Sequence, residues 1–247
     1  MKKNLCPALY IATLAARSAF AAPPDSPFGI TLVQNKSGPA LTAPLQMVLL
    51  LTLLTLLPAI LMSVTPFLRI VIVLHFLRQA LGTQTAPSNQ VQVGLALFLS
   101  ILIMQPVAVD VYQHAWEPLE QGKINAAQAW EQASGPIRTF FLKYAREKDI
   151  HLFIELSHSS MPARPSDVPL TALAPAYVLS ELKTAFQIGA VLFLPFLVID
   201  LVVASVALSA GMMQLPPVMI SAPFKILLFV LVDGWNLVVG SLVHSFH

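Results

Sequence analysis

Charged side chains are scarce in this sequence. Asp, Glu, Lys and Arg make up 11% of the 247 residues, whereas hydrophobic residues make up 56% and the mean hydropathy is +0.74. An ordinary soluble domain has about a quarter charged residues, so this composition indicates a protein that lies in a membrane or assembles there. The formal net charge is only +2 and the basic residues form no stripe, which argues against nucleic acid as a partner.

Catalytic motifs are also missing. The sequence has no glycine-rich phosphate loop and no G-x-S-x-G nucleophile elbow, so we expect neither an enzyme nor a bound cofactor. One pattern tests this expectation, because the spacing of His151, Glu155 and His158 would place them on one face of a helix. Two imidazoles and a carboxylate suit zinc, but the solvated face of an exterior helix explains them better. We predict no metal site.

The N-terminus has the features of a cleavable signal peptide. Lys2 and Lys3 precede an apolar stretch, and Ala19-Phe20-Ala21 fits an A-x-A cleavage site. We predict a signal peptide over residues 1–21 rather than an uncleaved anchor. Its removal would take away Cys6, the single cysteine, and leave a mature chain without thiol chemistry. Residues 22–44 are rich in Pro, Gly and Ser and predict an exposed leader.

The rest of the chain alternates apolar segments with one polar region. An all-α chain is predicted, because the apolar segments have the length of membrane helices or helical periodicity: 45–64, 67–81, 91–109, 180–210 and 217–243. Residues 110–178 hold most of the charge, and Ile137, Phe140, Phe141 and Tyr144 recur at helical spacing, with Pro136 suited to the first turn of that helix. We therefore divide the chain into N-terminal apolar helices (45–109), an exterior helical domain (110–178) and a C-terminal hairpin region (179–247).

Basic residues predict the orientation in the membrane. Arg69, Arg78 and Lys225 fall in or beside the short connections between apolar segments. Positive residues in short loops favour the cytoplasmic side. The domain at 110–178 would then lie outside the cytoplasm, as a signal peptide also implies.

Three charges fall within the C-terminal apolar segments: Asp200, Lys225 and Asp233. An ionised side chain at the middle of a membrane costs on the order of 3 kcal/mol, so it normally faces protein or water. For Lys225 the alternative is that its long side chain reaches the membrane interface. We therefore expect these charges to face protein or water rather than lipid.

The stretch "SAGMMQLPPV" interrupts the last two apolar segments. Gly211 is suited to end one helix, and Pro216-Pro217 to prevent its continuation and start another. Met212 and Met213 would then lie at the apex of a hairpin, where flexible thioether side chains adapt to irregular shapes. In a ring of copies such apices form a compliant seal; alternatively, they cap the hairpin against lipid.

Long passages of the chain resemble the FliP family. The resemblance is carried by "LTLLTLLPAILMSVTPFLRIVIVLHFLRQALGTQTAPSNQVQVGLALFLS" and by "PAYVLSELKTAFQIGAVLFLPFLVIDLVVASVALSAGMMQLPPVMISAPFKILLFVLVDGWNLVVGSLVHSF", and it covers about residues 45–246. It implies a non-enzymatic core subunit of the flagellar type III export gate, in the inner membrane within the basal body. Such subunits form a homo-oligomeric ring, expected to be a pentamer, with FliQ, FliR and other gate subunits in membrane lipid. Unfolded flagellar proteins would pass through its centre.

The resemblance also implies roles for particular residues. Met212 and Met213 match a methionine-rich gasket, which commonly has a third methionine where this chain has Gln214. Glu181 and Lys225 match an acidic and a basic position that are thought to pair across subunits. Two alternatives stay open: the homologous subunit of a virulence injectisome, and a subunit of a proton or ion channel.

Overall fold

The computed structural model describes residues 43–83, 86–158, 162, 164–211 and 216–246. Every regular element in these residues is helical, and they contain no strand, so the predicted all-α class is confirmed. The chain divides into two compact units, residues 1–54 and 55–247, with the boundary inside helix α2 (Ala43–Val64). The predicted signal peptide (1–21) and nearly all of the leader (22–44) lie outside the described residues.

Helix α2 is apolar on every side. Its large apolar side chains from Leu45 to Met62 are all 44–62% exposed, and the helix contains no charged residue. A helix that is apolar all round is stable in a bilayer or against another protein, and its 22 residues are enough to cross the hydrocarbon core.

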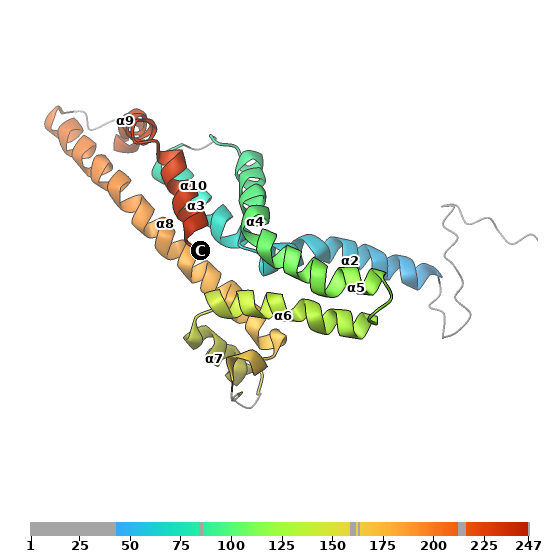
Figure 1. Cartoon of the computed structure of the whole chain (residues 1–247). Coiled ribbons are helices and arrows are strands. Elements are labelled where there is room, and N and C mark those ends of the chain that lie inside the picture. Colours follow the sequence, from blue (N-terminus) through green and yellow to red (C-terminus); the bar gives the residue numbers. More distant parts are fainter. Residues whose placement is uncertain (1–42, 84–85, 159–161, 163, 212–215, 247) are drawn as a thin grey trace, which may run out of the picture. The chain divides into compact units, whose positions relative to one another are not determined.

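The core of the second unit forms where α3 (Phe67–Ala80) packs on α8 (Leu170–Ser209). Ile70, Val73, Leu74 and Leu77 recur at the spacing of one helical face and are almost completely buried. On α8, Gly189 lets the two helices approach, since a Cβ there would lie 2.5 Å from Cδ2 of Phe76. Figure 1 shows α3 beside the middle of the long α8.

Two helices are longer than the sequence predicted. Helix α4 (Asn89–Val111) continues through a π-helical turn, η1 (Tyr112–Trp116), into α5 (Glu117–Glu120), so it does not end at Val109. Helix α8 has 40 residues and begins at Leu170, not at Ser180. Both helices therefore run across the limits of the predicted exterior domain, 110–178. A π-helical turn at Tyr112–Trp116 lies within this continuous helix.

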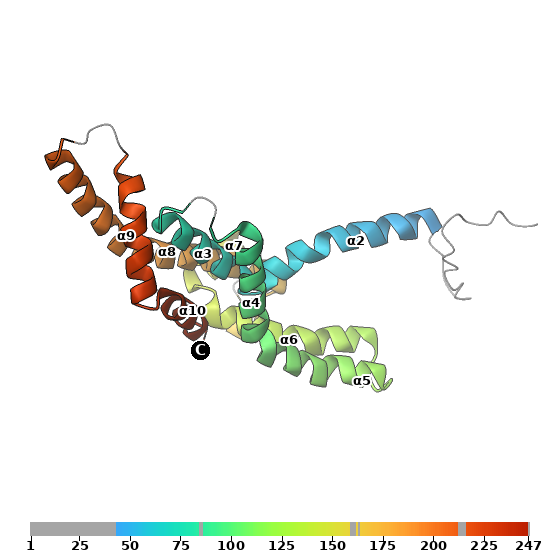
Figure 2. The ribbon, with the colours of Figure 1, turned by 90° about the horizontal axis from the view of Figure 1, so that it is seen from above.

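The region between α5 and α8 contains α6 (Ala126–Tyr144), α7 (Glu147–Leu156) and a short 3₁₀ turn, η2 (Pro165–Asp167). Figure 2 shows α5 and α6 side by side, joined by a tight connection. Phe140 and Phe141 are buried, and Phe141 stacks on Tyr177 of α8 with ring centroids 4.6 Å apart.

The start of α6 corrects one prediction. The helix begins at Ala126, and Pro136 lies in its interior instead of its first turn. Asn125 and Gln128 form a reciprocal capping box, in which each side chain accepts a hydrogen bond from the backbone of the other. This cap satisfies two of the free N–H groups of the helix end, and so determines the start in place of the proline.

The last apolar segment is broken. The sequence predicted one span over 217–243, but the structure has α9 (Pro217–Leu231) and α10 (Gly234–His244), bent by 66°. Asp233 has a left-handed backbone (φ +50°) between them. The ring of Phe229 fills the inside of the bend, where a Cβ on Gly234 would lie 2.3 Å from its Cδ2.

By length and composition, three described helices can cross a membrane: Pro44–Val64, Asn89–Glu120 and Leu170–Ser209. The bent pair α9–α10 brings the number to four if it forms one broken span.

Candidate functional site

Helix α8 ends and helix α9 begins where the sequence predicted. Helix α8 ends at Ser209, and Gly211 follows with a positive φ of +77° that suits glycine. Helix α9 starts at Pro217, with Pro216 as its extended N-cap residue. The predicted gasket residues Met212 and Met213, together with Gln214, lie outside the described residues.

A cluster around Lys225 fixes this hairpin from inside; we call it the Lys225 cluster. The Lys225 side chain is 1% exposed, and its Nζ donates to Oδ2 of Asp200 at 2.6 Å and to the carbonyl oxygen of Ala80 at 3.0 Å. The Ser221 hydroxyl donates to the other carboxylate oxygen of Asp200 at 2.5 Å. One ammonium group therefore joins α9 to α8 and to the end of α3. Asp200 and Lys225 therefore contact each other within the chain.

A second cluster, the Arg69 cluster, lies between α3 and α8. The Arg69 guanidinium donates from Nε to Oε2 of Glu181 at 2.7 Å and from Nη2 to Oε1 at 2.5 Å. Both side chains are nearly inaccessible, at 4% and 1% exposure. This two-pronged geometry is the arrangement in which a guanidinium binds a carboxylate most strongly.

The C-terminal end of α10 closes over the Arg69 cluster. Arg69 Nη1 donates to Oγ of Ser245 at 3.0 Å, and the guanidinium carbon lies 3.8 Å from the centroid of the Phe246 ring. The Tyr144 hydroxyl donates to the carbonyl oxygen of Phe246, and the two rings meet edge to face with centroids 5.1 Å apart. The buried guanidinium of Arg69 on α3 thus holds α8 and the C-terminal end of the chain beside α3.

Within one chain, Glu181 and Lys225 do not pair with each other. Glu181 binds Arg69, and Lys225 binds Asp200. The predicted contact between Glu181 and Lys225 across subunits stays a prediction, and it would be made by two groups that already have partners. Sequence reasoning missed Arg69 as the partner, although its position inside the apolar run "FLRIVIVL" was a signal, because a charge there needs a counterion.

The same contacts correct the argument for orientation. Arg69 and Lys225 are buried in α3 and α9 and neutralise carboxylates, so they are not loop charges that face the cytoplasm. Arg78 also belongs to α3, but it lies in the last turn and is only partly buried. Of the three basic residues used to predict the orientation, only Arg78 still indicates which end of its helix faces the cytoplasm.

A third polar network joins α7 to α8. Asp149 is 2% exposed and accepts hydrogen bonds from the Ser180 hydroxyl at 2.8 Å and from the Lys183 ammonium. Burial raises the pKa of Asp149, but these hydrogen bonds and the positive charges of Lys183 and Arg146 outweigh burial, so its pKa falls below the ordinary value. Arg146 extends the network by donating to Gln187 at 2.7 Å.

The His151, Glu155 and His158 side chains form no group of metal ligands among the described residues. His151 and Glu155 lie on α7, whereas His158 follows the end of that helix with a positive φ of +50°. In the described part of the chain, no three His, Cys, Asp or Glu side chains are grouped closely enough to bind a metal ion. Asp233 is exposed at the bend between α9 and α10 and accepts a hydrogen bond from Asn236 at 3.2 Å.

A comparison with known protein families matches most of the chain. The model of the FliP family matches residues 50–242. The chain belongs to the FliP family. Its relatives include the flagellar biosynthetic protein FliP of Bacillus subtilis (strain 168), 50% identical over 217 residues, which are 88% of this chain and 98% of that protein.

Two other members of the FliP family are similarly close. The flagellar biosynthetic protein FliP of Pectobacterium carotovorum subsp. carotovorum is 51% identical over 218 residues, which are 88% of this chain and 84% of that protein. The flagellar biosynthetic protein FliP of Caulobacter vibrioides is 50% identical over 201 residues, 81% of this chain and 76% of that protein.

Proposed function

We propose that this chain is a pore-forming subunit of the flagellar protein export gate in the inner membrane. Its copies form a ring, expected to be a pentamer, with FliQ, FliR and other gate subunits. Unfolded flagellar proteins pass through the centre of the ring. Membership of the FliP family supports the flagellar role, and the names of the relatives favour it over the injectisome alternative.

The hairpin between α8 and α9 is the observation that carries the pore proposal. Its two arms are apolar and largely exposed outward, whereas the Lys225 cluster holds them together from within. The connection between the arms holds Met212 and Met213. In a ring, these connections meet around the axis, and flexible thioether side chains close the opening yet adapt to a passing polypeptide.

The pairing of Lys225 with Asp200 makes the ion-channel alternative less favourable. Ion filters are usually formed by rings of charged side chains or by carbonyl groups that face the pathway. Here the ammonium is 1% exposed, and both its bonds go to groups of the same chain. The positive charge of Lys225 is therefore neutralised by Asp200 within the subunit.

The test is the conductance of the purified ring complex in planar bilayers. Replacement of Met212 and Met213 by alanine removes two long side chains per subunit, so the closed pore should leak ions. A control variant with Met47 and Met62 of α2 replaced by alanine changes the composition equally and should stay closed. Tryptophan at 212 and 213 should instead block export, because a stiff ring does not adapt to a passing chain. A double-alanine variant as tight as wild type would refute the seal.

A further inference from the structure

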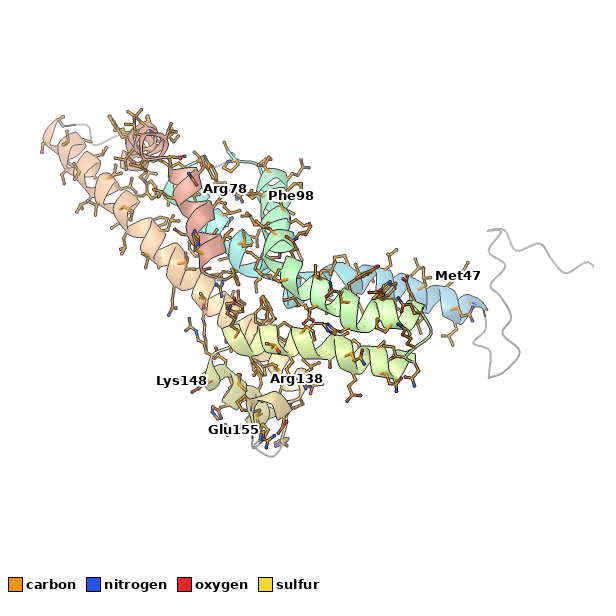
Figure 3. The ribbon with its side chains drawn as sticks, viewed as in Figure 1. Met47, Arg78, Phe98, Arg138, Lys148 and Glu155 are labelled. Carbon is orange, nitrogen blue, oxygen red and sulfur yellow. The ribbon has the colours of Figure 1, made fainter. Side chains whose placement is uncertain are left out.

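A groove of about 530 Å³ lies between the second half of α3, the first turn of α4 and Phe186 of α8. Its polar lining residues are His75, Arg78, Gln79, Asn89 and Gln92. Val71, Phe76 and Val93 are among its apolar lining residues. Figure 3 labels Arg78 at the polar part of this region and Phe98 further along α4.

Among the described residues, the side chain of Arg78 has no acidic partner. Its Nη1 donates to Oδ1 of Asn89 at 2.5 Å and lies 3.5 Å from the carbonyl oxygen of Pro87, and its Nη2 lies 3.2 Å from Nδ1 of His75. No described Asp or Glu forms an ion pair with Arg78, and none lines the groove. A cation beside apolar walls without a counterion attracts an anion from outside.

The wall of α4 continues from this polar end as an apolar stripe. Val93, Leu97 and Ile101 follow Asn89 at intervals of four residues, so they lie on the same face, and they are 40%, 49% and 61% exposed. Twelve residues of helix span about 18 Å, close to one leaflet of a hydrocarbon core about 30 Å thick. The exposed aromatic residues Tyr112 and Trp116 follow at the other end, as is typical of a membrane interface.

We propose that this groove binds an anionic phospholipid, with its phosphate at Arg78 and an acyl chain along the α4 stripe. A guanidinium and a phosphate form strong, geometrically specific hydrogen bonds. A cation at one end and an apolar stripe one leaflet long match the two parts of a lipid. A small inorganic anion would use the cation but leave the stripe uncovered. The proposal rests on the membrane location in the proposed function.

Native mass spectrometry of the purified ring complex tests the proposal. The complex is incubated in detergent with phosphatidylglycerol or phosphatidylcholine, and the retained lipids are counted. Wild type should retain phosphatidylglycerol preferentially, and Arg78→Gln should weaken that retention about tenfold. Lys148→Gln removes one exposed positive charge from α7 (Figure 3) and should change nothing. Arg78→Lys keeps the charge and should retain an intermediate amount.

Three results would overturn this assignment. Equal retention of the two lipids by wild type would exclude a preference for the anionic headgroup. Displacement of phosphatidylglycerol by millimolar inorganic phosphate would reduce the groove to a general anion site. Loss of ring assembly in Arg78→Gln, with lipid retention unchanged in the rings that remain, would identify a contact between subunits instead. The conductance test on Met212 and Met213 is independent of these results, so the lipid site and the pore can fail separately.

Discussion

Arg69 shows how a single side chain determines the interior of this protein. It binds Glu181 through two hydrogen bonds, reaches Ser245, and lies against the ring of Phe246. A buried ion pair contributes little net stability compared with well-packed apolar residues, but the loss of one partner leaves an uncompensated charge. The main effect of the Arg69–Glu181 pair is therefore to determine which segments of the chain pack together.

Arg69→Gln or Glu181→Gln should each destabilise the chain by about 3–5 kcal/mol, because each leaves a buried charge alone. The double variant Arg69→Gln/Glu181→Gln should cost less than the sum, and Arg69→Met/Glu181→Leu should recover most of the stability. Denaturant unfolding of the detergent-solubilised chain measures these effects. If the double variant loses as much free energy of unfolding as the two single variants together, the two side chains are not coupled.

The same cycle applied to Glu181 and Lys225 tests the predicted contact across subunits. In the isolated chain their effects should add, since each residue has a different partner. Coupling that arises only in the assembled ring would support the contact across subunits. Additive effects in both states would exclude it.

Asp149 should make the stability of the α7–α8 contact depend on pH. Its pKa is lowered in the fold, so the carboxylate stabilises the protein above its unfolded pKa of about 3.9, and this contribution disappears as the pH falls through the folded pKa. Asp149→Asn should cost about 1–3 kcal/mol at pH 7, and the cost should shrink progressively as the pH falls below about 3.9. Thermal unfolding across this range measures the difference. Glu155→Gln, on the exposed part of α7, should unfold in parallel with wild type at every pH.

At the scale of helices, the sequence predicted most of the elements but few of their limits. The ends at Gly211 and Pro217 were predictable because glycine and proline act there through the backbone itself. The break before Gly234 was missed, although Asp-Gly is a common turn pair, because no proline marks it. The early start of α8 was missed because its residue Tyr177 packs on Phe140 and Phe141 of α6, and such tertiary contacts are not visible in a local pattern.

The crossing of α3 and α8 depends on the absence of a side chain at Gly189. Gly189→Ala places a Cβ 2.5 Å from Phe76, whose ring is also held edge-on by Phe186, so we expect a loss of about 1–3 kcal/mol. Phe76→Leu in the same chain should restore part of it. Gly240→Ala is the matched control: a Cβ there meets nothing within 4 Å, and alanine should stabilise α10 by up to about 1 kcal/mol. If Gly189→Ala and Gly240→Ala changed the free energy of unfolding equally, a clash at the crossing of α3 and α8 would be ruled out as the cause.

For the whole molecule, composition was the most informative property. The scarcity of charge predicted membrane-length helices, and three of them, or four with the bent pair, meet the criteria of length and apolarity. The partners of the charges were not predictable, because Arg69 and Glu181 are separated by 112 residues and meet only through the packing of α3 on α8. For this reason the sequence alone did not reveal that Arg69 and Lys225, which were used to predict the orientation, are counterions of carboxylates within the chain.

Orientation is therefore best tested directly. In a Cys6→Ser background, Lys148→Cys on the exposed surface of α7 should react with a membrane-impermeant maleimide added to intact spheroplasts. Ala86→Cys, exposed between α3 and α4, should react only after the membrane is permeabilised. Reaction in the opposite order would place α7 on the cytoplasmic side and reverse the predicted topology.

The position of Gly189 within α8 has a mechanical consequence. Gly189 lies close to the midpoint between Leu170 and Ser209, so the contact with Phe76 divides α8 into two lengths of about 30 Å each. One length is attached to α7 through Asp149, and the other to α9 through Asp200. A tilt of about 5° would move each end by about 2.5 Å in opposite directions. Such a tilt would couple α7 to α9 only if the bonds of α3 to both lengths of α8, through Arg69 and through Lys225, moved with it.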